Sequence, residues 1–464
     1  MQAQQFQAVT HSFPQRRTAI SFIFSGFRTL FIATGVVPRF FFAHAGSNAP
    51  APPKSFPRPL FSYSYELLFP QLLSFHIHSH CPGVAGQNPP QQSQNYGETL
   101  SRFHLELAAF FRHTGAALWG LRLGFRRNMR IESKAPTRVD LAGGTLDIWP
   151  LYLFHPGAVT VNAAITRYAS CRIETHERGD ARIRLVSRDT QREEAFASFA
   201  ELVKGKRYKL PLLAEIVKFF QPQGGFTLTT DSEAPAGAGI GGSSAMAVAI
   251  CAALDRYTGA GKSKADWIHI SRDAEAIVIR VPTGTQDHYP PAFGGAAAIE
   301  LPPGGERRTE LRVDLSELER RIVLCYTGKP RKSAINNWDV FRAHINGDTG
   351  VFRNLARISE VAQELRGALE RSNWADVGRL MREEWSFRKR NLPNITTKTI
   401  DKIVDNTRRR GALAGKVCGA GGGGCVVLLI EPETREKVEA AVVEAGGEVL
   451  PMKIDRSGVQ VNVS

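Results

Sequence analysis

The chain has 464 residues, which is more than one average domain and suggests two or three. Hydrophobic residues make up 43% and charged residues 22%, as in an ordinary soluble globular protein. The formal net charge is +15, but residues 1–128 contain eleven Lys/Arg and only three acids, so more than half of the excess lies there. The remainder is only mildly basic, which suits anionic small molecules and argues against DNA or RNA as a partner.

Residues 1–128 differ in kind from the rest of the chain. They hold 17 of the 27 Phe, no Asp and several Pro-rich stretches, and they sustain no helical or strand period. Because the segment is basic and contains an apolar run over residues 19–37, one interpretation is a targeting peptide. Gly26, Arg28 and Gly35 interrupt the run, so a membrane span is not expected. We expect instead a low-complexity extension that is disordered or not translated, with translation starting at Met129.

Regular hydrophobic patterns begin at Met129, which opens the first expected strand. Apolar alternation predicts further strands at 157–174, 181–187, 226–230, 294–301 and 320–327, and helical spacing predicts helices at 210–220, 243–257 and 263–280. Residues 333–411 are expected to be helical throughout, followed by a strand at 424–430, a helix at 432–444 and a strand at 447–462. This order indicates an α+β fold with two domains, residues 129–304 and 305–464, divided where Pro and Gly break the pattern.

Six cysteines are scattered along the chain, at positions 81, 171, 251, 325, 418 and 425. None belongs to a Cys-x-x-Cys pair or to a Cys/His cluster with zinc-ligand spacing. Most lie in apolar runs, where Cys behaves as a small buried hydrophobic residue. A reducing compartment, the cytoplasm, is therefore expected.

The strongest chemical signal is a glycine-rich loop between an expected strand and an expected helix. It reads Pro-Ala-Gly-Ala-Gly-Ile-Gly-Gly-Ser-Ser-Ala over residues 235–245. Glycines adopt positive φ freely, so consecutive backbone N–H groups can surround an anion. Ser243 or Ser244 can cap the following helix, whose N-terminus attracts phosphate. The spacing is neither a Walker A loop nor a dinucleotide-binding fingerprint, and it favours a phosphate-binding loop over a turn that is merely flexible.

This loop resembles the second motif of the galactokinase–homoserine kinase–mevalonate kinase–phosphomevalonate kinase (GHMP) family. Two further stretches are similar to the family's first and third motifs, Ala-Pro-Thr-Arg-Val-Asp-Leu-Ala-Gly-Gly-Thr-Leu-Asp at 135–147 and Lys-Val-Cys-Gly-Ala-Gly-Gly-Gly-Gly-Cys at 416–425. The resemblance covers residues 129–464. It implies a ribosomal-protein-S5-domain-2-like N-terminal domain with a left-handed crossover, a ferredoxin-like C-terminal domain, and an active site between them that uses ATP and Mg²⁺.

The resemblance also assigns the residues that bind the nucleotide and the metal. Those expected at the ATP phosphates are Pro235, Gly237, Gly239, Gly241, Gly242, Ser243 and Ser244. The hydroxyl of Ser244 and the carboxylate of Glu275 would hold the magnesium ion. The third-motif glycines are expected to bring the backbone close to the active site and to steady the phosphate loop.

The reacting groups are assigned in the same way. Asp287 would act as the general base or orient the acceptor hydroxyl, and Arg138 would place a cation beside it. These roles suit phosphoryl transfer, in which the protein mainly positions the hydroxyl and neutralises phosphate charge. Asp147 would bind substrate hydroxyls, since one carboxylate can accept from two of them, with Gly144 and Gly284 beside it.

The first motif bears on the substrate. Residues 143–147 read Gly-Gly-Thr-Leu-Asp, which is closer to the kinases of heptose phosphates and fucose than to galactokinase. We therefore expect a small-molecule sugar or sugar phosphate as acceptor. A mevalonate-type alcohol kinase and a non-catalytic ATP- and sugar-binding regulator remain alternatives, although Arg138 argues mildly against the first and the presence of Asp287 and Glu275 against the second. Neither nucleic acid nor membrane is an expected partner, and a monomer or homodimer is expected.

Two basic stretches follow in the C-terminal half. Lys329, Arg331 and Lys332 surround a turn after an expected strand. This turn is expected to be a solvated loop or, where it faces the cleft, a binding site for a phosphate on the substrate. The run 388–390, near Glu383 and Glu384, is expected to be an exposed helix end.

Overall fold

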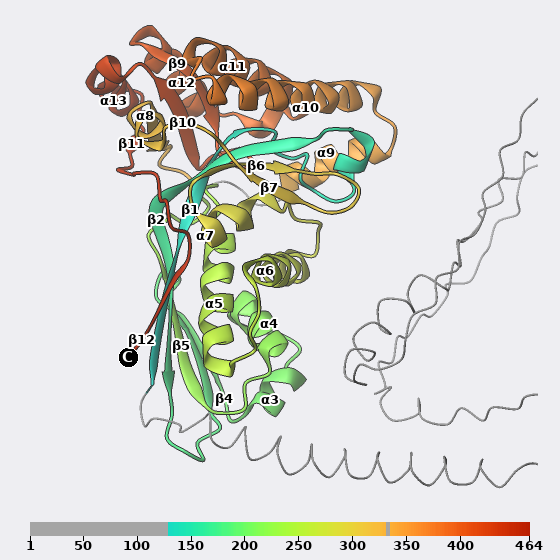
Figure 1. Cartoon of the computed structure of the whole chain (residues 1–464), viewed down its shortest axis with the longest axis vertical. Coiled ribbons are helices and arrows are strands. Elements are labelled where there is room, and N and C mark those ends of the chain that lie inside the picture. The colour runs from blue at the N-terminus through green and yellow to red at the C-terminus, as the bar shows by residue number, and fades with distance from the viewer. Residues whose placement is uncertain (1–128, 331–334) are drawn as a thin grey trace, which may run out of the picture. The chain divides into compact units, whose positions relative to one another are not determined.

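The computed structural model describes residues 129–330 and 335–464, the side chains of residues 335 and 336 excepted (Figure 1). Residues 1–128, on which the targeting and extension interpretations rest, and the cations Arg331 and Lys332 lie outside the described residues. Within the described part, the mixed order of strands and helices confirms the α+β prediction. No helix in this part is long and apolar enough to cross a bilayer.

An eight-stranded sheet is built around two long antiparallel strands, β1 (Arg130–Ala142) and β2 (Val159–Thr175). One end of β2 pairs with β5 (Phe226–Ser232) and the other with β6 (Ala296–Glu300), so the sheet branches. The remaining strands extend these branches and the β1 edge: β3 (Ile183–Ser187), β4 (Arg192–Phe196), β7 (Arg307–Glu310) and β12 (Gln460–Val463).

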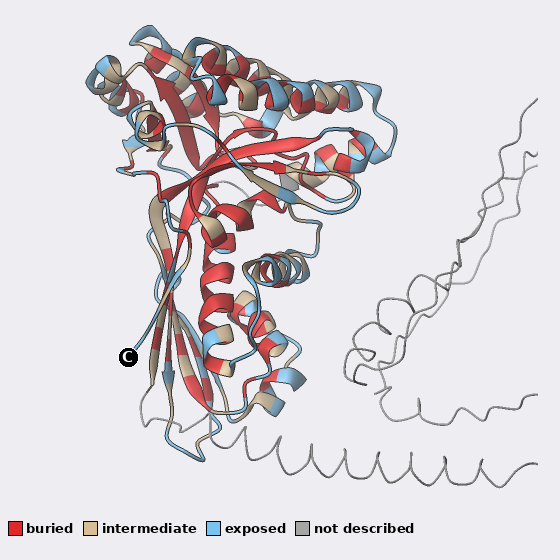
Figure 2. Cartoon of the chain, viewed as in Figure 1, coloured by how far each residue is buried: buried red, intermediate tan, exposed pale blue. Residues whose placement is uncertain are grey.

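One helix lies against this sheet and is buried almost all round (Figure 2). It is α5 (Gly242–Thr258), which packs on β1 and β2. Its many alanines allow close approach, and Ser133 of β1 donates to the Ala249 carbonyl at 2.7 Å. Two further helices, α4 (Pro211–Phe220) and α6 (Lys264–Ile279), pack on α5, and the short α3 (Phe199–Lys204) packs on α4. A capping box of Ser263 and Asp266 fixes the start of α6.

A second, four-stranded antiparallel sheet has the order β11-β8-β10-β9. Its strands are β8 (Ile322–Tyr326), β9 (Ala412–Val417), β10 (Cys425–Ile430) and β11 (Glu448–Val449). Helices α10 (Thr349–Glu370), α11 (Trp374–Asn391) and α12 (Lys398–Arg409) connect β8 to β9, and α13 (Arg435–Glu444) connects β10 to β11. This strand order with two helical connections is the ferredoxin-like arrangement, as predicted.

Short elements complete the described chain. They are η1 (Leu151–Phe154), η2 (Gln286–His288), α7 (Tyr289–Phe293), α8 (Leu315–Arg320), α9 (Ile335–Ile345), η3 (Pro393–Ile395) and η4 (Pro432–Thr434). The five described cysteines are free and buried, as expected. The expected domain boundary at residue 304 falls in the turn between β6 and β7, and β12 returns from the C-terminal end to pair with β1. The division into residues 129–304 and 305–464 therefore stays a prediction.

Candidate active site

The glycine-rich loop forms one wall of a cavity of about 820 Å³. Gly237, Gly239 and Gly241 have φ of +67°, +75° and +74°, a conformation that other residues adopt only at a cost. These turns curl the loop between β5 and the first turn of α5. The predicted phosphate-binding residues that line the cavity are Pro235, Gly237, Gly239, Gly241, Gly242 and Ser243. Ser244, which is 1% exposed, lies just behind this lining.

The prediction that Ser243 or Ser244 caps α5 is wrong. The capping position is taken by Gly241, so both serines lie inside the first helical turn. Their hydroxyls instead donate to the two carboxylate oxygens of Glu275 on α6, that of Ser244 at 3.0 Å. Burial raises the pKa of Glu275, but His288, 3.3 Å away, and the two serines outweigh this and lower it to about 2. Glu275 is therefore a carboxylate at neutral pH.

Ser244 and Glu275 together suit a magnesium ion. Mg²⁺ takes oxygen ligands and typically binds one or two protein groups, with phosphate and water oxygens completing its shell. A serine that donates its proton to Glu275 keeps its lone pairs free for a metal. Among the described residues, no group of three or more His, Cys, Asp or Glu could hold a metal.

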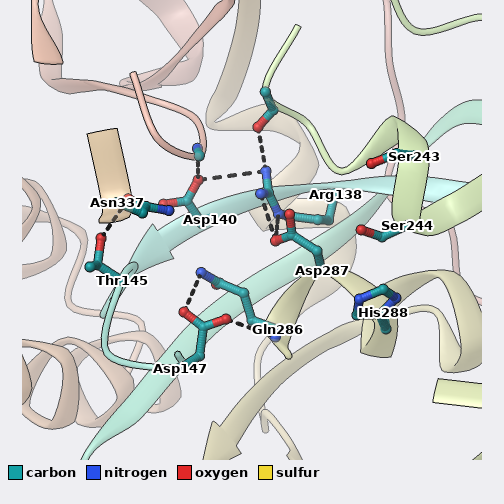
Figure 3. A network of polar contacts seen from close by, with 12 residues as sticks. Arg138, Asp140, Thr145, Asp147, Ser243, Ser244, Gln286, Asp287, His288 and Asn337 are labelled. Atoms are coloured by element: carbon teal, nitrogen blue, oxygen red, sulfur yellow. Dashed lines mark hydrogen bonds and ion pairs between the residues drawn. The ribbon is translucent and has the colours of Figure 1, made fainter. Parts of the chain in front are cut away.

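Arg138 of β1 joins the phosphate loop to Asp287 (Figure 3). Its Nε and Nη2 donate to Asp287 Oδ1 at 2.9 and 2.6 Å, and its Nη1 donates to the Gly239 carbonyl at 2.7 Å. Burial lowers the pKa of Arg138, but Asp287 and Asp140 outweigh it and raise the pKa above its usual range. Asp287 lines the cavity with its side chain 27% exposed. Its Oδ2 makes no hydrogen bond to another described residue, so it can face a ligand.

Asp147 lines the same cavity on the other side of the Arg138–Asp287 pair from Ser243 and Ser244 (Figure 3). Its oxygens accept the Gln286 backbone N–H at 3.0 Å and the Gln286 side-chain amide at 3.3 Å. Gly284 leaves room for this carboxylate, because a Cβ there would clash with Asp147 Oδ2. Burial, and next the charge of Asp287, raise the pKa of Asp147 to about 6. Gly144 and Gly284 also line the cavity.

A buried charge cluster supports this centre. It includes Glu384 and Arg388, so the prediction of an exposed helix end is wrong for these two residues, whereas Lys389 and Arg390 are exposed as predicted. Glu384 is fully buried and Arg388 is 3% exposed, both on the inner side of α11. Lys416 Nζ of β9 lies 3.0 Å from Glu384 Oε1 and 3.1 Å from Asp140 Oδ2. Burial raises the pKa of Asp140, but Lys416, Arg138 and Arg388 hold it well below its usual range.

The sequence did offer a signal for this cluster. Asp140 lies two residues after Arg138 and therefore on the same face of β1, and Lys416 interrupts an apolar strand. Its partners on α11, Glu384 and Arg388, lie in a strongly charged stretch that reads as solvent-exposed. Asn337 and Trp338 of α9, which also line the cavity, were not predicted, since no motif marks them.

The third motif contacts the phosphate loop through the backbone, as expected. The Cys425 N–H donates to the Ala238 carbonyl at 2.7 Å. A Cβ on Gly424 would lie 2.5 Å from the same carbonyl oxygen, so only glycine allows this approach. The Gly419 N–H donates to Asp140 Oδ1 at 3.0 Å, which ties the motif to β1 as well.

A phosphate-type loop and an arginine-bound aspartate, facing a second carboxylate across one cavity, define a phosphotransferase that acts on a hydroxyl. Protein-family models that match the sequence identify the class more specifically. Residues 208–295 match the GHMP kinases N terminal domain and residues 365–448 match the GHMP kinases C terminal domain. The chain therefore carries matches to both domains of the GHMP kinases.

Individual relatives span most of the described chain. The D-glycero-alpha-D-manno-heptose 7-phosphate kinase of Campylobacter jejuni is 27% identical over 71% of this chain and 98% of that protein. The mevalonate kinase of Thermococcus sibiricus is 26% identical over 72% and 98%. Among solved structures, a D-glycero-D-manno-heptose 1-phosphate kinase from Bacteroides thetaiotaomicron has a TM-score of 0.56 at 25% identity, covering 72% of this chain and 98% of that one. Lactococcus lactis galactokinase, at a TM-score of 0.60 and 17% identity over 71% and 95%, shares the fold.

Proposed function

We propose that this protein transfers the γ-phosphoryl group of ATP to a hydroxyl of a sugar or sugar phosphate. One observation carries the proposal: the Arg138–Asp287 pair lies between the phosphate loop and the buried carboxylate of Asp147 (Figure 3). ATP bound at the loop and an acceptor bound at Asp147 would meet at Asp287. The heptose-phosphate kinases among the relatives support a sugar acceptor.

In this mechanism, Asp287 Oδ2 accepts the proton of the acceptor hydroxyl as its oxygen attacks the γ-phosphorus. The bond from the γ-phosphorus to the β,γ-bridging oxygen breaks, and ADP leaves. Arg138 holds Asp287 by Oδ1 and keeps its carboxylate aimed at the acceptor. Positive charge beside the transferring group stabilises the transition state.

The proposal includes the binding of nucleotide and metal. The positive-φ glycines of the loop present their backbone to the ATP phosphates. Ser244 and Glu275 would hold Mg²⁺, which would neutralise phosphate charge when bound. A cytoplasmic location and a monomeric or homodimeric state belong to the same proposal.

The full chain, supplied with Mg·ATP, tests the proposal through ADP release. The acceptor panel comprises free hexoses including fucose, heptose phosphates and mevalonate, and the variants are Asp287→Asn and the exposed Asp405→Asn as control. We expect turnover of a sugar, a loss of about 10²- to 10⁴-fold in kcat in Asp287→Asn, and an unchanged control. Turnover of mevalonate alone would make the protein an alcohol kinase. ATP binding without turnover of any acceptor would make it a regulator.

A further inference from the structure

Helix α9 supplies two cavity-lining residues, Asn337 and Trp338, to which no motif assigns a role. The hydroxyl of Thr145 donates to Asn337 Oδ1 at 3.2 Å. Thr145 lies between Gly144 and Asp147 in the first motif, so this bond fixes the start of α9 beside the Asp147 end of the cavity. Figure 3 shows Thr145, Asp147 and Asn337 on one side of the Arg138–Asp287 pair, with the two serines on the other. Helix α9 therefore borders the acceptor end.

The indole of Trp338 is supported from within its own helix. It stacks on the ring of Phe341, with centroids 5.0 Å apart and an angle of 14° between the planes. Phe341 in turn packs against the hydrophobic core beneath the first sheet. Trp338 is half-buried and lines the cavity, so its indole, supported by Phe341, presents an aromatic surface to the cavity.

To the acceptor end of the cavity, Arg388 adds a hydrogen-bond donor that has no partner in the described part of the chain. Its side chain is 3% exposed and lines the cavity, and its Nη2 donates to the Gly419 carbonyl. Its Nη1 has no hydrogen-bond partner among the described residues, the nearest carboxylate oxygen being Asp140 Oδ2 at 3.6 Å. A Cβ on Gly144 would lie 3.6 Å from this nitrogen, which places it beside the first motif. A buried donor without an acceptor is costly, so Nη1 points to an oxygen supplied by a ligand.

We propose that Trp338, Asn337 and Arg388 form the acceptor subsite and select a cyclic polyol, that is, a sugar in its ring form. The C–H face of a sugar ring is apolar and stacks on an aromatic surface, while its hydroxyls accept from Arg388 and Asn337 and donate to Asp147. A linear hydroxy acid such as mevalonate offers no such face. This inference rests on the proposed function and narrows its substrate class.

The test compares Trp338→Ala and Trp338→Phe with Trp149→Ala in the full chain. Trp149 is 64% exposed and is not among the residues that line the cavity, so it is a matched control. With the sugar that the wild type phosphorylates, we expect Trp338→Ala to raise the acceptor KM about ten- to a hundredfold. The KM for ATP should change less than about twofold. Trp338→Phe should restore most of the acceptor affinity, because it restores an aromatic face, and the control should match the wild type.

Tryptophan fluorescence gives a readout that is independent of turnover. We expect the sugar to change the emission of the wild type and of Trp149→Phe, and to leave that of Trp338→Phe unchanged. Arg388→Lys, which keeps the charge but removes Nη1, should raise the acceptor KM and leave the KM for ATP near the wild-type value.

Two failures are distinguishable. A wild type that turns over no sugar would refute the proposed function itself. If the wild type turns over a sugar but Trp338→Ala has the wild-type acceptor KM, only the acceptor subsite is overturned. The same holds if the sugar changes the emission of Trp338→Phe as much as that of the wild type. A rise in the ATP KM equal to the rise in the acceptor KM would also overturn it, since Trp338 would then act on the whole cavity.

Discussion

The surroundings of Asp147 shift the pKa of its carboxyl group in opposite directions. Burial and the nearby Asp287 raise its pKa, while the backbone N–H of Gln286 lowers it, and the result is about 6. Only the ionised form can accept hydrogen bonds from two substrate hydroxyls through all its lone pairs. Acceptor binding through Asp147 should therefore depend on pH within the physiological range.

The sign of this dependence follows from the raised pKa. Above about pH 6 Asp147 is ionised and ready to bind, and below it the carboxyl protonates and acceptor affinity falls. We expect kcat/KM for the acceptor to fall by up to about tenfold per pH unit below this point. Asp147→Asn should have a lower kcat/KM without this step. If the step near pH 6 survives in Asp147→Asn, it belongs to another group.

Gly284 makes room for Asp147 and provides a second test at the level of one residue. Adding a methyl group in Gly284→Ala would press on Asp147 Oδ2 and turn the carboxylate away from the acceptor. We expect the acceptor KM to rise about tenfold or more, since small displacements in an active site are costly. Gly304→Ala, where nothing lies within 4 Å of the new methyl, is the matched control. Equal kinetics in the two variants would contradict this role of Gly284.

At the level of elements, ionic contacts in the core join β1, β9 and α11. Lys416 forms ion pairs with both Glu384 and Asp140, and all three side chains are almost fully buried. Removing one partner from such a cluster leaves an uncompensated charge in the core. We expect Lys416→Met to lower the free energy of unfolding by about 3–5 kcal/mol in urea titrations. The exposed Lys402→Met should change it by less than about 0.5 kcal/mol.

A second variant separates charge from packing in this cluster. Lys416→Met combined with Glu384→Met removes one charge of each sign, so part of the lost stability should return. The loss in unfolding free energy of the double variant is compared with the summed losses of Lys416→Met and Glu384→Met. If the two are equal, the loss comes from packing around β9 and α11 rather than from an unpaired carboxylate.

The same cluster shows where sequence reasoning reaches its limit. The glycine-rich loop and helices such as α5 were predicted because their signals are local: periodicity, positive-φ glycines and a strand before a helix. The contacts of Glu384 and Arg388 with β9 and β1 join residues far apart in the chain, so their charges read as a solvated helix end. Strand β7 was missed because Arg-Arg-Thr-Glu has no apolar alternation and forms only by pairing with β6. Trp338 was missed because no motif surrounds it.

On the scale of the whole described chain, the site is assembled from both sheets. Residues 412–425 bring the second sheet to the phosphate loop, and the Gly419 N–H binds Asp140 of the first. In the opposite direction, the chain leaves the second sheet after β11, and β12 then joins the first sheet by pairing with β1. The phosphate loop is thus held from both sides, and its shape should depend on the third motif.

Gly424 offers a direct test of that dependence. It has φ of +80° and touches the Ala238 carbonyl of the phosphate loop, whereas a methyl group added at Gly446, which has φ of +87°, would meet nothing within 4 Å. Alanine at either position meets the same backbone penalty of about 1–2 kcal/mol, and only at Gly424 does the added methyl group also press on the phosphate loop. Only Gly424→Ala should displace the loop, and we expect it to raise the KM for ATP about tenfold or more while the acceptor KM stays near the wild-type value. A similar rise in Gly446→Ala, or none in Gly424→Ala, would mean that the third motif stabilises the fold without shaping the nucleotide site.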